Sequence, residues 1–338
     1  MITIFSDPHL GLNRTSHTTP ASRERLKEAL YKQAKALAPF TIKPLTDVYC
    51  LGDLYDTYWS DANTVKQGLE IYQHVDVCLI GNHDFSQRAN ATSALRLCHD
   101  IMEDAWDEPS EASVKTTHAE GFSIQYVNHK MTQQLFDASL EKVRKVGGVL
   151  FLHCNFDNGF ATDEASLNLS RAQAEALLEK VDLVFSGHEH TSAAHFNGRL
   201  IMTGNTHPTS FSDISDKYSW HVDKDLKVTR ELIWSTNYAV KLDYAHLLEG
   251  SCDLVHMEFI EIVGQAERAE LPKIARAVAN LWKTCPNAYM IKNSVTCEQF
   301  DAEKVDEVHI ADVITTLSAE LSHTKLNTLW KHYVGRVQ

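Results

Sequence analysis

The stretch that decides the fold is Asp47-Val48-Tyr49-Cys50-Leu51-Gly52-Asp53-Leu54-Tyr55-Asp56. Its first half mixes β-branched, aromatic and small apolar residues, which predicts a buried strand over 47–51. A glycine and two carboxylates follow where the strand should stop, and glycine permits tight backbone geometry beside an ion. A strand followed by Gly-Asp is common in itself, so the prediction depends on what surrounds this stretch.

Four other polar clusters follow apolar runs in the same way. They are Asp7-Pro8-His9 after 2–5, Gly81-Asn82-His83-Asp84 after 75–80, His153 after 149–152, and Gly187-His188-Glu189-His190 after 181–185. Segments with helical spacing lie between them, from Ser22 (the expected N-cap) to Leu37 and over 62–73, 131–145 and 170–180. This alternation predicts an α/β fold with ligands at the strand ends.

Antiparallel strands complete the predicted sheets. Alternating Phe122, Ile124 and Tyr126 indicate an antiparallel pair within 114–128. Asn197-Gly198 predicts a hairpin turn between strands at 193–196 and 199–203. With further strands expected at 217–222 and 226–234, residues 1–240 are assigned to one large domain.

The chain beyond about residue 240 carries fewer chemical motifs. We expect a linker near 240–250, strands at 253–261 and 287–293, and helices at 270–282, 307–321 and 324–335. This pattern predicts a small α+β capping domain with a helical tail over 244–338. A chain of 338 residues is long enough for one large and one small domain.

Composition narrows the broad class of the protein. Apolar content of 43% and charged content of 23% are ordinary for a soluble globular protein, and no run approaches the roughly 20 apolar residues of a membrane-spanning helix. We expect a cytoplasmic location, because the N-terminal residues lack the pattern of a signal peptide and the seven scattered cysteines include no CxxC pair. A net charge of −13 argues against a broad basic surface for nucleic acid.

The five polar clusters together supply carboxylate, amide and imidazole groups. This donor set suits borderline first-row ions such as Mn, Fe or Zn better than Mg. Two such ions, about 3.5–4 Å apart, need a bridging ligand, and one carboxylate between two sets of neutral ligands can bridge them. Because paired ions activate water and neutralise phosphoryl charge, hydrolysis of phosphate esters is the reaction that this set serves best.

Each of these residues also has an ordinary structural interpretation. Any one of the 18 histidines is more often a surface or core residue than a ligand, and Asn82 could simply form a turn. Asp56 and Asp84 fit better as supporting or turn residues than as ligands. The joint occurrence of five clusters, each after an apolar run, favours a metal site.

The clusters resemble the pattern of the calcineurin-like metallophosphoesterases (D-x-H, G-D-x-x-D, G-N-H-D/E, H and G-H-x-H) over about residues 1–235. The resemblance implies a four-layer α/β/β/α sandwich with a dinuclear centre between the strand ends. It implies one metal held by Asp7, His9, Asp53 and His190, and another held by Asn82, His153 and His188, with Asp53 bridging both. His83 is then expected to contact the scissile phosphate and to protonate or orient the leaving oxygen.

Finer similarities point to a subfamily. Protein phosphatases of this superfamily carry an arginine soon after the second Asp of G-D-x-x-D, whereas Thr57-Tyr58-Trp59 follows here. The first, second and last clusters resemble those of SbcD-type DNA repair nucleases. Chain length and the stretch from Gly204 to Trp220 are similar to the recombination endonuclease subunit of large tailed phages. One departure is that Gly204-Asn205-Thr206-His207-Pro208 stands where SbcD-type proteins have Gly-x-Pro.

The SbcD-type resemblance implies a DNA exonuclease and endonuclease subunit of repair or recombination. Its two divalent ions are expected to be Mn²⁺, with Mg²⁺ or Fe²⁺ as alternatives. It implies an SbcC-type coiled-coil ATPase partner, which would supply duplex-binding surface that the acidic chain lacks, and a homodimer through helices near 62–73 and 88–99. The C-terminal helices would pack either on the partner's coiled coil or on the cap's own core.

Two other functions stay open. A small-molecule or cyclic-nucleotide phosphodiesterase of the same fold is compatible with the acidic charge and with the size of the cap. A non-catalytic scaffold is also compatible with the fold, but the complete ligand set and the presence of His83 argue against it.

Overall fold

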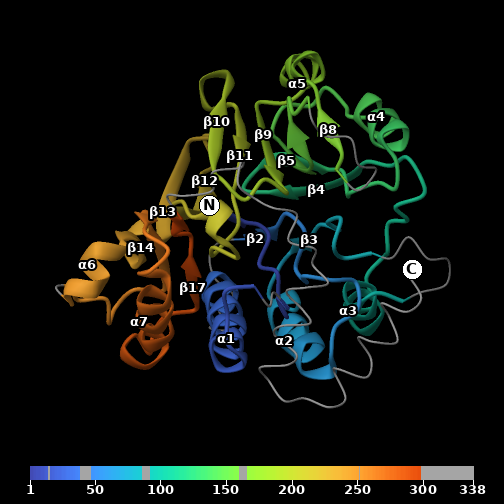
Figure 1. Cartoon of the computed structure of the whole chain (residues 1–338). Helices are drawn as coiled ribbons and strands as arrows, with labels where there is room; N and C mark the ends of the chain where they lie inside the picture. The colour runs from blue at the N-terminus through green and yellow to red at the C-terminus, as the bar shows by residue number, and fades with distance from the viewer. Residues whose placement is uncertain (14–15, 39–46, 86–91, 160–165, 251, 298–338) are drawn as a thin grey trace, which may run out of the picture.

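The computed structural model describes residues 1–13, 16–38, 47–85, 92–159, 166–250 and 252–297. Two mixed sheets lie face to face in the centre of the larger part (Figure 1). Helices α1, α2 and α3 cover the outer side of one sheet, and α4 and α5 cover the outer side of the other (Figure 1). The predicted four-layer α/β/β/α sandwich is confirmed.

The first sheet has the strand order β13-β12-β1-β2-β3. The parallel strands β1, β2 and β3 end at one edge, and β12 and β13 extend the sheet in antiparallel fashion. The parallel strands therefore bring the polar clusters that follow them to the same place. The bounds are β1 Ile2–Phe5, β2 Asp47–Cys50, β3 Val77–Cys78, β12 Lys217–Val222 and β13 Val228–Trp234.

The second sheet has the order β10-β11-β9-β6-β5-β4. Strands β5, β6, β9 and β11 are parallel, and the β4–β5 and β10–β11 pairs are the two predicted antiparallel pairs. Asn197 and Gly198 both have positive φ in the predicted hairpin turn. The bounds are β4 Lys115–Ala119, β5 Phe122–Tyr126, β6 Val149–His153, β9 Leu183–Gly187, β10 Ala193–His195 and β11 Leu200–Met202.

Apolar side chains alternate between the two faces of the central strands. In β2, Tyr49 packs between the sheets with Phe151, whereas its neighbours Val48 and Cys50 pack towards the helices. This is the period of two that a strand buried on both faces requires. Each fully buried large side chain contributes about 1.5–3 kcal/mol to stability, so the contact between the sheets is a major part of the folding energy.

Helix α1 (Pro20–Leu37) starts earlier than predicted. Thr19 is the N-cap: its Oγ1 accepts from the Ser22 amide at 3.1 Å, and its own amide donates to Ser22 Oγ at 2.9 Å. Pro20 suits the first helical position because no N–H is needed there. The prediction of Ser22 as the N-cap is therefore wrong, since Ser22 is the reciprocal partner in a capping box.

Several element boundaries differ from the predicted ones for local reasons. Strand β3 spans only Val77–Cys78, because the amide of Ile80 turns to the side chain of Asn128 (2.8 Å). Strand β15 begins at Phe259 and not near 253, because the Asp253 side chain accepts from the Val255 amide in a turn.

The remaining helices are α2 Ala62–Tyr72, α3 Ala94–Met102, α4 Gln133–Glu141, α5 Arg171–Leu178, α6 Tyr244–Glu249 and α7 Leu271–Thr284. Within the described ranges, none of the helices combines the length and apolarity needed to cross a bilayer.

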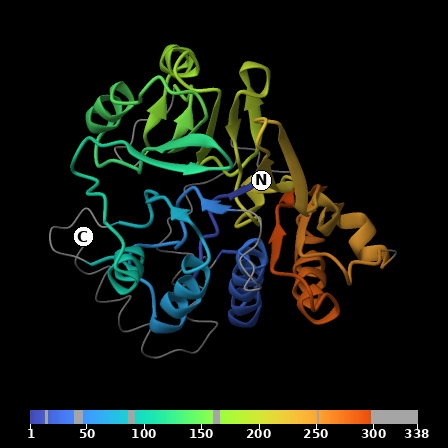
Figure 2. The same cartoon turned by 180° about the vertical axis from the view of Figure 1, so that it is seen from behind.

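The C-terminal part forms a parallel three-stranded sheet of β14 (Ala239–Asp243), β15 (Phe259–Val263) and β17 (Met290–Asn293). Strand β14 and helix α6 occupy 239–249, so the prediction of a linker near 240–250 is wrong. Both views place α7 beside α1 (Figures 1 and 2), and the sheet packs on α1 through Phe259 and Met290. The domain boundaries stay a prediction, and the helices expected at 307–321 and 324–335 lie outside the described residues.

Gly68 of α2 lies directly against the buried ring of Tyr55, with which an added Cβ would collide. Gly68→Ala gains about 1 kcal/mol of helix propensity, but overpacking a rigid core typically costs about 1–3 kcal/mol. We expect a net fall in the midpoint of thermal unfolding. Gly159→Ala is the control, because no atom of the described residues lies within 4 Å of its added Cβ. An equal or higher midpoint for Gly68→Ala would show that Tyr55 can move aside.

Candidate metal centre

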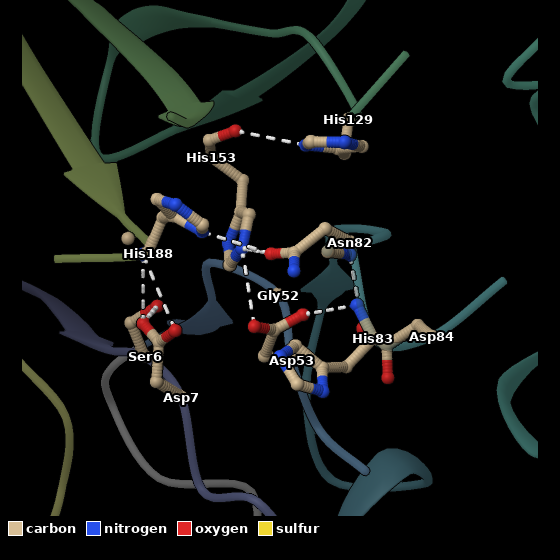
Figure 3. A network of polar contacts seen from close by, with 12 residues as sticks. Ser6, Asp7, Gly52, Asp53, Asn82, His83, Asp84, His129, His153 and His188 are labelled. Atoms are coloured by element: carbon tan, nitrogen blue, oxygen red, sulfur yellow. Dashed lines mark hydrogen bonds and ion pairs between the residues drawn. The ribbon is translucent and has the colours of Figure 1, made fainter. Parts of the chain in front are cut away.

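The polar clusters predicted from the sequence meet at one edge of the two sheets. The residues after β1, β2 and β3 approach those at the ends of β6 and β9 (Figure 3). All seven predicted metal ligands and His83 belong to one connected group of side chains. They are Asp7, His9, Asp53, Asn82, His83, His153, His188 and His190.

One half of this group contains Asp7, His9 and His190, whose ligand atoms all lie within 4.8 Å of one another. The Nε2 atoms of His9 and His190 are 2.9 Å apart. Two imidazole nitrogens at this separation, beside a buried carboxylate, form a donor set into which a divalent cation fits.

The other half surrounds the amide oxygen of Asn82. This Oδ1 lies 3.0 Å from His153 Nε2 and 2.8 Å from His188 Nδ1 (Figure 3). The carboxylate of Asp53 approaches the same ring, with Oδ2 at 3.4 Å from His153 Nε2. Asp53 also groups with His9 and His83 on the other side. The structure thus places Asp53 between the two halves, where a bridging ligand is needed.

The four histidines that point into the centre have their outer ring nitrogens beside other groups. The contacts of His153, His190 and His188 orient those rings and leave the opposite nitrogen facing the centre, whereas His9 Nδ1 makes no hydrogen bond with the described residues and lies only near the Asp56 carboxylate. The pairs are His153 Nδ1 with Leu51 O (2.7 Å), His190 Nδ1 with Asp213 Oδ2 (3.1 Å), His9 Nδ1 with Asp56 Oδ1 (3.5 Å) and His188 Nε2 with Ser166 Oγ (3.5 Å).

Glycines leave the space that the centre occupies. A Cβ on Gly52, whose φ is +103°, would lie 2.6 Å from His153 Nδ1, and a Cβ on Gly81 would collide with the Asp53 carboxylate. A Cβ on Gly187 would collide with the Ser6 side chain and lie 3.0 Å from Asp7 Oδ2. The glycines of the second, third and last clusters are therefore required by close approach to ligand side chains.

Four of the predicted ligands have left-handed backbone conformations. The φ angles are 54° for Asp7, 47° for His9, 50° for Asp53 and 81° for His188. Such conformations are uncommon for residues other than glycine, and they persist only where surrounding structure enforces them. Their concentration in this small region supports a functional site, since strain of this kind gathers where side chains must be aimed.

Burial and neighbouring charges set the ionisation of the centre. Burial lowers the pKa of His9 well below its usual value and that of His188 to about 3, which leaves both rings neutral and able to bind a cation. Burial opposes the charged forms of Asp53 and His153 too, but their mutual attraction prevails. It holds the pKa of Asp53 well below its usual range and raises that of His153 to about 10. A cation held by His153 would require this ring to release its proton.

His83 lies at the rim of the centre. Its amide donates to Asp53 Oδ1 at 2.9 Å, and its Nδ1 lies 2.5 Å from the main-chain oxygen of Asp56. Burial lowers its pKa, but the Asp53 charge and the Asp56 carbonyl outweigh burial and raise it above the usual value. The ring is therefore suited to hold a proton for a leaving group.

The two acids expected to play supporting parts contact the backbone and a ligand. Asp84 is fully buried and accepts from the amides of Leu54, Tyr55 and Gly81 at 2.9–3.3 Å, so it joins the second cluster to the third. Asp56 lies beside His9 and presents its carbonyl to His83. Among the described residues, neither acid belongs to a group of side chains close enough together to hold a metal ion.

Three residues that contact the centre were not predicted from the sequence. Ser6 donates to the Asp7 carboxylate, Asp213 contacts His190, and Lys217 donates to the main-chain oxygen of His190 at 2.9 Å. Burial opposes ionisation of Asp213, but its hydrogen bonds and Lys217 hold its pKa well below the usual range. The spacing Ser210-x-x-Asp213 could have predicted the capped turn at Phe211–Asp213, but nothing in it indicates the contact with His190.

The arrangement matches a known family. The sequence profile of the calcineurin-like phosphoesterases matches residues 1–192, more than half of the chain. The chain belongs to this family. This calcineurin-like phosphoesterase is accordingly a metal-dependent hydrolase of phosphate esters, in a family whose members typically use two metal ions. The predicted superfamily and enzyme class are confirmed. The assignment to the SbcD-type subfamily stays a prediction.

Other comparisons add little about this phosphoesterase. One solved structure to which it is similar is a conserved uncharacterized protein from Streptococcus pneumoniae TIGR4, described as a predicted phosphoesterase. The two are 13% identical, the similarity covers 68% of this chain and 96% of the other, and the TM-score is 0.25. No curated protein matches the chain.

The donors present can bind two cations and act on a phosphoryl group. When bound, two divalent ions neutralise phosphoryl charge and activate water. The chain's own residues aim the ligands through their outer ring nitrogens, exclude water by burial of Asp7, Asp53 and His153, and place His83 for proton transfer at the rim.

Replacement of Asp53 should empty the whole centre, because this carboxylate lies between both halves. We expect Asp53→Asn to lose both ions and His190→Ala to lose one, measured as bound metal per chain after gel filtration of protein loaded with Mn²⁺. Asp157→Asn removes an exposed carboxylate that pairs with Arg171 and should keep both ions. Tight retention of both ions by folded Asp53→Asn would show that Asp53 does not bridge.

Proposed function

We propose that this phosphoesterase is a Mn²⁺-dependent DNA exonuclease and endonuclease subunit that acts with an SbcC-type ATPase. The proposal is supported by the motif-level resemblance together with the convergence of every residue in that motif set, His83 included, at one edge of the sheets. The absence of an arginine from Thr57-Tyr58-Trp59 sets the chain apart from protein phosphatases.

The surroundings of the centre are compatible with a polymeric substrate. A groove of about 550 Å³ lies beside His190 and Asp213. Its lining continues from the metal centre along Asn155, Thr191 and Ser212. An exposed groove of this kind can admit a strand of nucleic acid whose ends extend beyond the protein, which a closed pocket cannot.

One observation favours the second candidate, a small-molecule or cyclic-nucleotide phosphodiesterase. None of the described residues that line the groove is a lysine or arginine, and two of them, Glu189 and Asp213, are acids. DNA binding usually relies on cationic contacts with the phosphate backbone. The nuclease proposal therefore requires the ATPase partner, a second copy of the chain and the two metal ions to supply positive charge.

The proposed homodimer finds support on the outer face of α3. Leu97, Ile101 and Met102 are 40%, 50% and 41% exposed, and all three are large apolar side chains on one short helix. Trp59 is 74% exposed and follows Tyr58, whose carbonyl accepts from the first amide of α3. Clustered exposed apolar residues are typical of an interaction surface. The part of the expected dimer segment that precedes residue 92 lies outside the described residues.

The test of the proposed activity is hydrolysis of end-labelled linear duplex DNA in Mn²⁺, with and without the ATPase. We expect cleavage that the ATPase strengthens and that His83→Ala reduces about 10²- to 10⁴-fold, the range of a lost general acid. Bound metal per chain should be unchanged in His83→Ala, because His83 is not one of the seven predicted ligands. Loss of metal would instead make His83 a ligand, since its ring lies within 4.8 Å of ligand atoms of His9 and Asp53.

Cyclic mononucleotides and cyclic dinucleotides serve as competing substrates in the same assay. Rapid turnover of one of them, with no cleavage of DNA in Mn²⁺ in either the presence or the absence of the ATPase, would establish the second candidate instead. Two bound ions with no hydrolysis of any phosphodiester would support a scaffold.

The proposed dimer surface is tested by Ile101→Asp, which places a charge in the exposed face of α3. We expect this variant to elute as a monomer where the parent chain is a dimer, measured by light scattering after size exclusion. Val146→Asp is the matched control, because Val146 is 51% exposed but lies before β6. Dimers that persist in Ile101→Asp would place the interface elsewhere.

A further inference from the structure

Two residues that follow His190 in the chain, Asp213 and Lys217, contact it at two different points. Its ring Nδ1 lies 3.1 Å from Asp213 Oδ2, and its main-chain oxygen accepts from Lys217 Nζ at 2.9 Å. The first contact fixes the rotation of the ring, and the second fixes the backbone from which the ring projects. The remaining nitrogen, Nε2, is thereby aimed at His9 Nε2.

The carboxylate of Asp213 is itself fixed in orientation. It is 5% exposed and accepts from several donors in addition to the His190 ring. These are Asn205 Nδ2 (2.9 Å), the Thr209 amide (3.0 Å), Thr209 Oγ1 (2.9 Å) and the Ser210 amide (2.8 Å). So many directed bonds hold the carboxylate in one position, which is what an orienting group needs.

Lys217 completes the arrangement from the other side. Its side chain is fully buried and also donates to the main-chain oxygen of Asp213 at 2.6 Å and to Ser215 Oγ at 3.1 Å. A buried lysine and a buried aspartate each carry a large desolvation cost, which their opposite charges offset when both are present. The two charges therefore depend on each other for burial while each holds a different end of His190.

The segment that carries Asp213 is anchored at a second place. His207 is buried in an aromatic cluster, with ring centroids 5.7 Å from Trp234, 6.1 Å from Phe259 and 5.7 Å from Tyr289. Phe259 and Tyr289 belong to the C-terminal part of the chain. The stretch 205–213 is thus held between that part and the metal centre, so its carboxylate is presented by a rigid support.

We propose that Asp213 and Lys217 are positioning residues that clamp His190 and thereby set the affinity of the metal that His190 holds. The inference rests on the ligand role of His190 in the proposed centre, but it does not depend on whether the substrate is DNA. If the pair were merely structural, its loss would lower stability and leave metal affinity unchanged.

The experiment is an isothermal titration of the metal-free full chain with Mn²⁺, in which calorimetry measures binding. Hydrolysis of bis(p-nitrophenyl) phosphate is the second readout. We expect Asp213→Asn to bind one ion about 10- to 100-fold more weakly, the usual effect of losing such a partner, and the other ion as before. The Mn²⁺ concentration for half-maximal hydrolysis should rise, and kcat should recover at saturating Mn²⁺.

A double variant separates positioning from stability. Lys217→Met and Asp213→Asn should each lower the thermal midpoint, because each leaves a buried charge without its partner. The double variant should be more stable than the Lys217→Met variant yet bind the ion as weakly as Asp213→Asn. Asp216→Asn is the control, since Asp216 is a nearby carboxylate that accepts from Thr236 and from the Tyr218 hydroxyl and not from His190. It should leave both affinities unchanged.

Unchanged affinity for both ions in folded Asp213→Asn overturns the proposal. If Asp213→Asn does not fold, Thr209→Val removes one bond to the carboxylate at nearly constant volume. It should weaken one ion severalfold, and unchanged binding there also overturns the proposal. Should His190→Ala keep both ions, the ligand assignment itself fails. Failure of DNA cleavage alone affects only the proposed substrate.

Discussion

Apolar packing between the two sheets determines the distance across the metal centre, because the ligands come from both sheets. Asp7 and Asp53 follow strands of the first sheet, whereas His153 ends one strand of the second and His188 follows another. Hydrogen bonds cross between the sheets at this edge, among them His153 Nδ1 with Leu51 O (2.7 Å) and the His188 amide with Asp7 Oδ2 (3.0 Å). Behind them the Tyr49 and Phe151 rings pack at 5.1 Å. Because such interiors are dense and rigid, the packed sheets fix the distance between the ligands of the first sheet and those of the second.

The same edge concentrates buried ionisable groups that would be costly one at a time. Asp7, Asp53 and His153 are almost completely buried, and they tolerate burial because acids and imidazoles stand beside one another. Asp213 and Lys217, which contact His190 from outside the centre, are likewise a buried acid and a buried base near each other. Stability and the proposed function are thus coupled in this part of the molecule, since the groups proposed to bind or orient a cation also neutralise one another.

The sequence allows prediction of what depends on local pattern. The parallel strands and the polar clusters at their ends follow from apolar runs that end in polar motifs, whereas the order of the layers was implied by the family resemblance. Contacts made across many residues could not be predicted in this way. Asp213 reaches His190 only because a turn after β11 folds back, and strand β14 pairs with β15 although its residues suggest a linker. Thr19 could not be singled out as the N-cap of α1, because Ser22, the other half of the capping box, has the same preference for helix starts.

The pairing of β1 with β12 has a consequence for how the protein is made. Ile2 lies opposite Val222, so the first strand to leave the ribosome waits for more than half of the chain before its second neighbour exists. His188 and His190 are likewise synthesised long after Asp7 and His9. A nascent chain can fold its early helices, yet the centre cannot assemble until the later strands emerge. Synthesis in this order means that the eight clustered residues are not all present until His190, more than halfway along the chain, has been added.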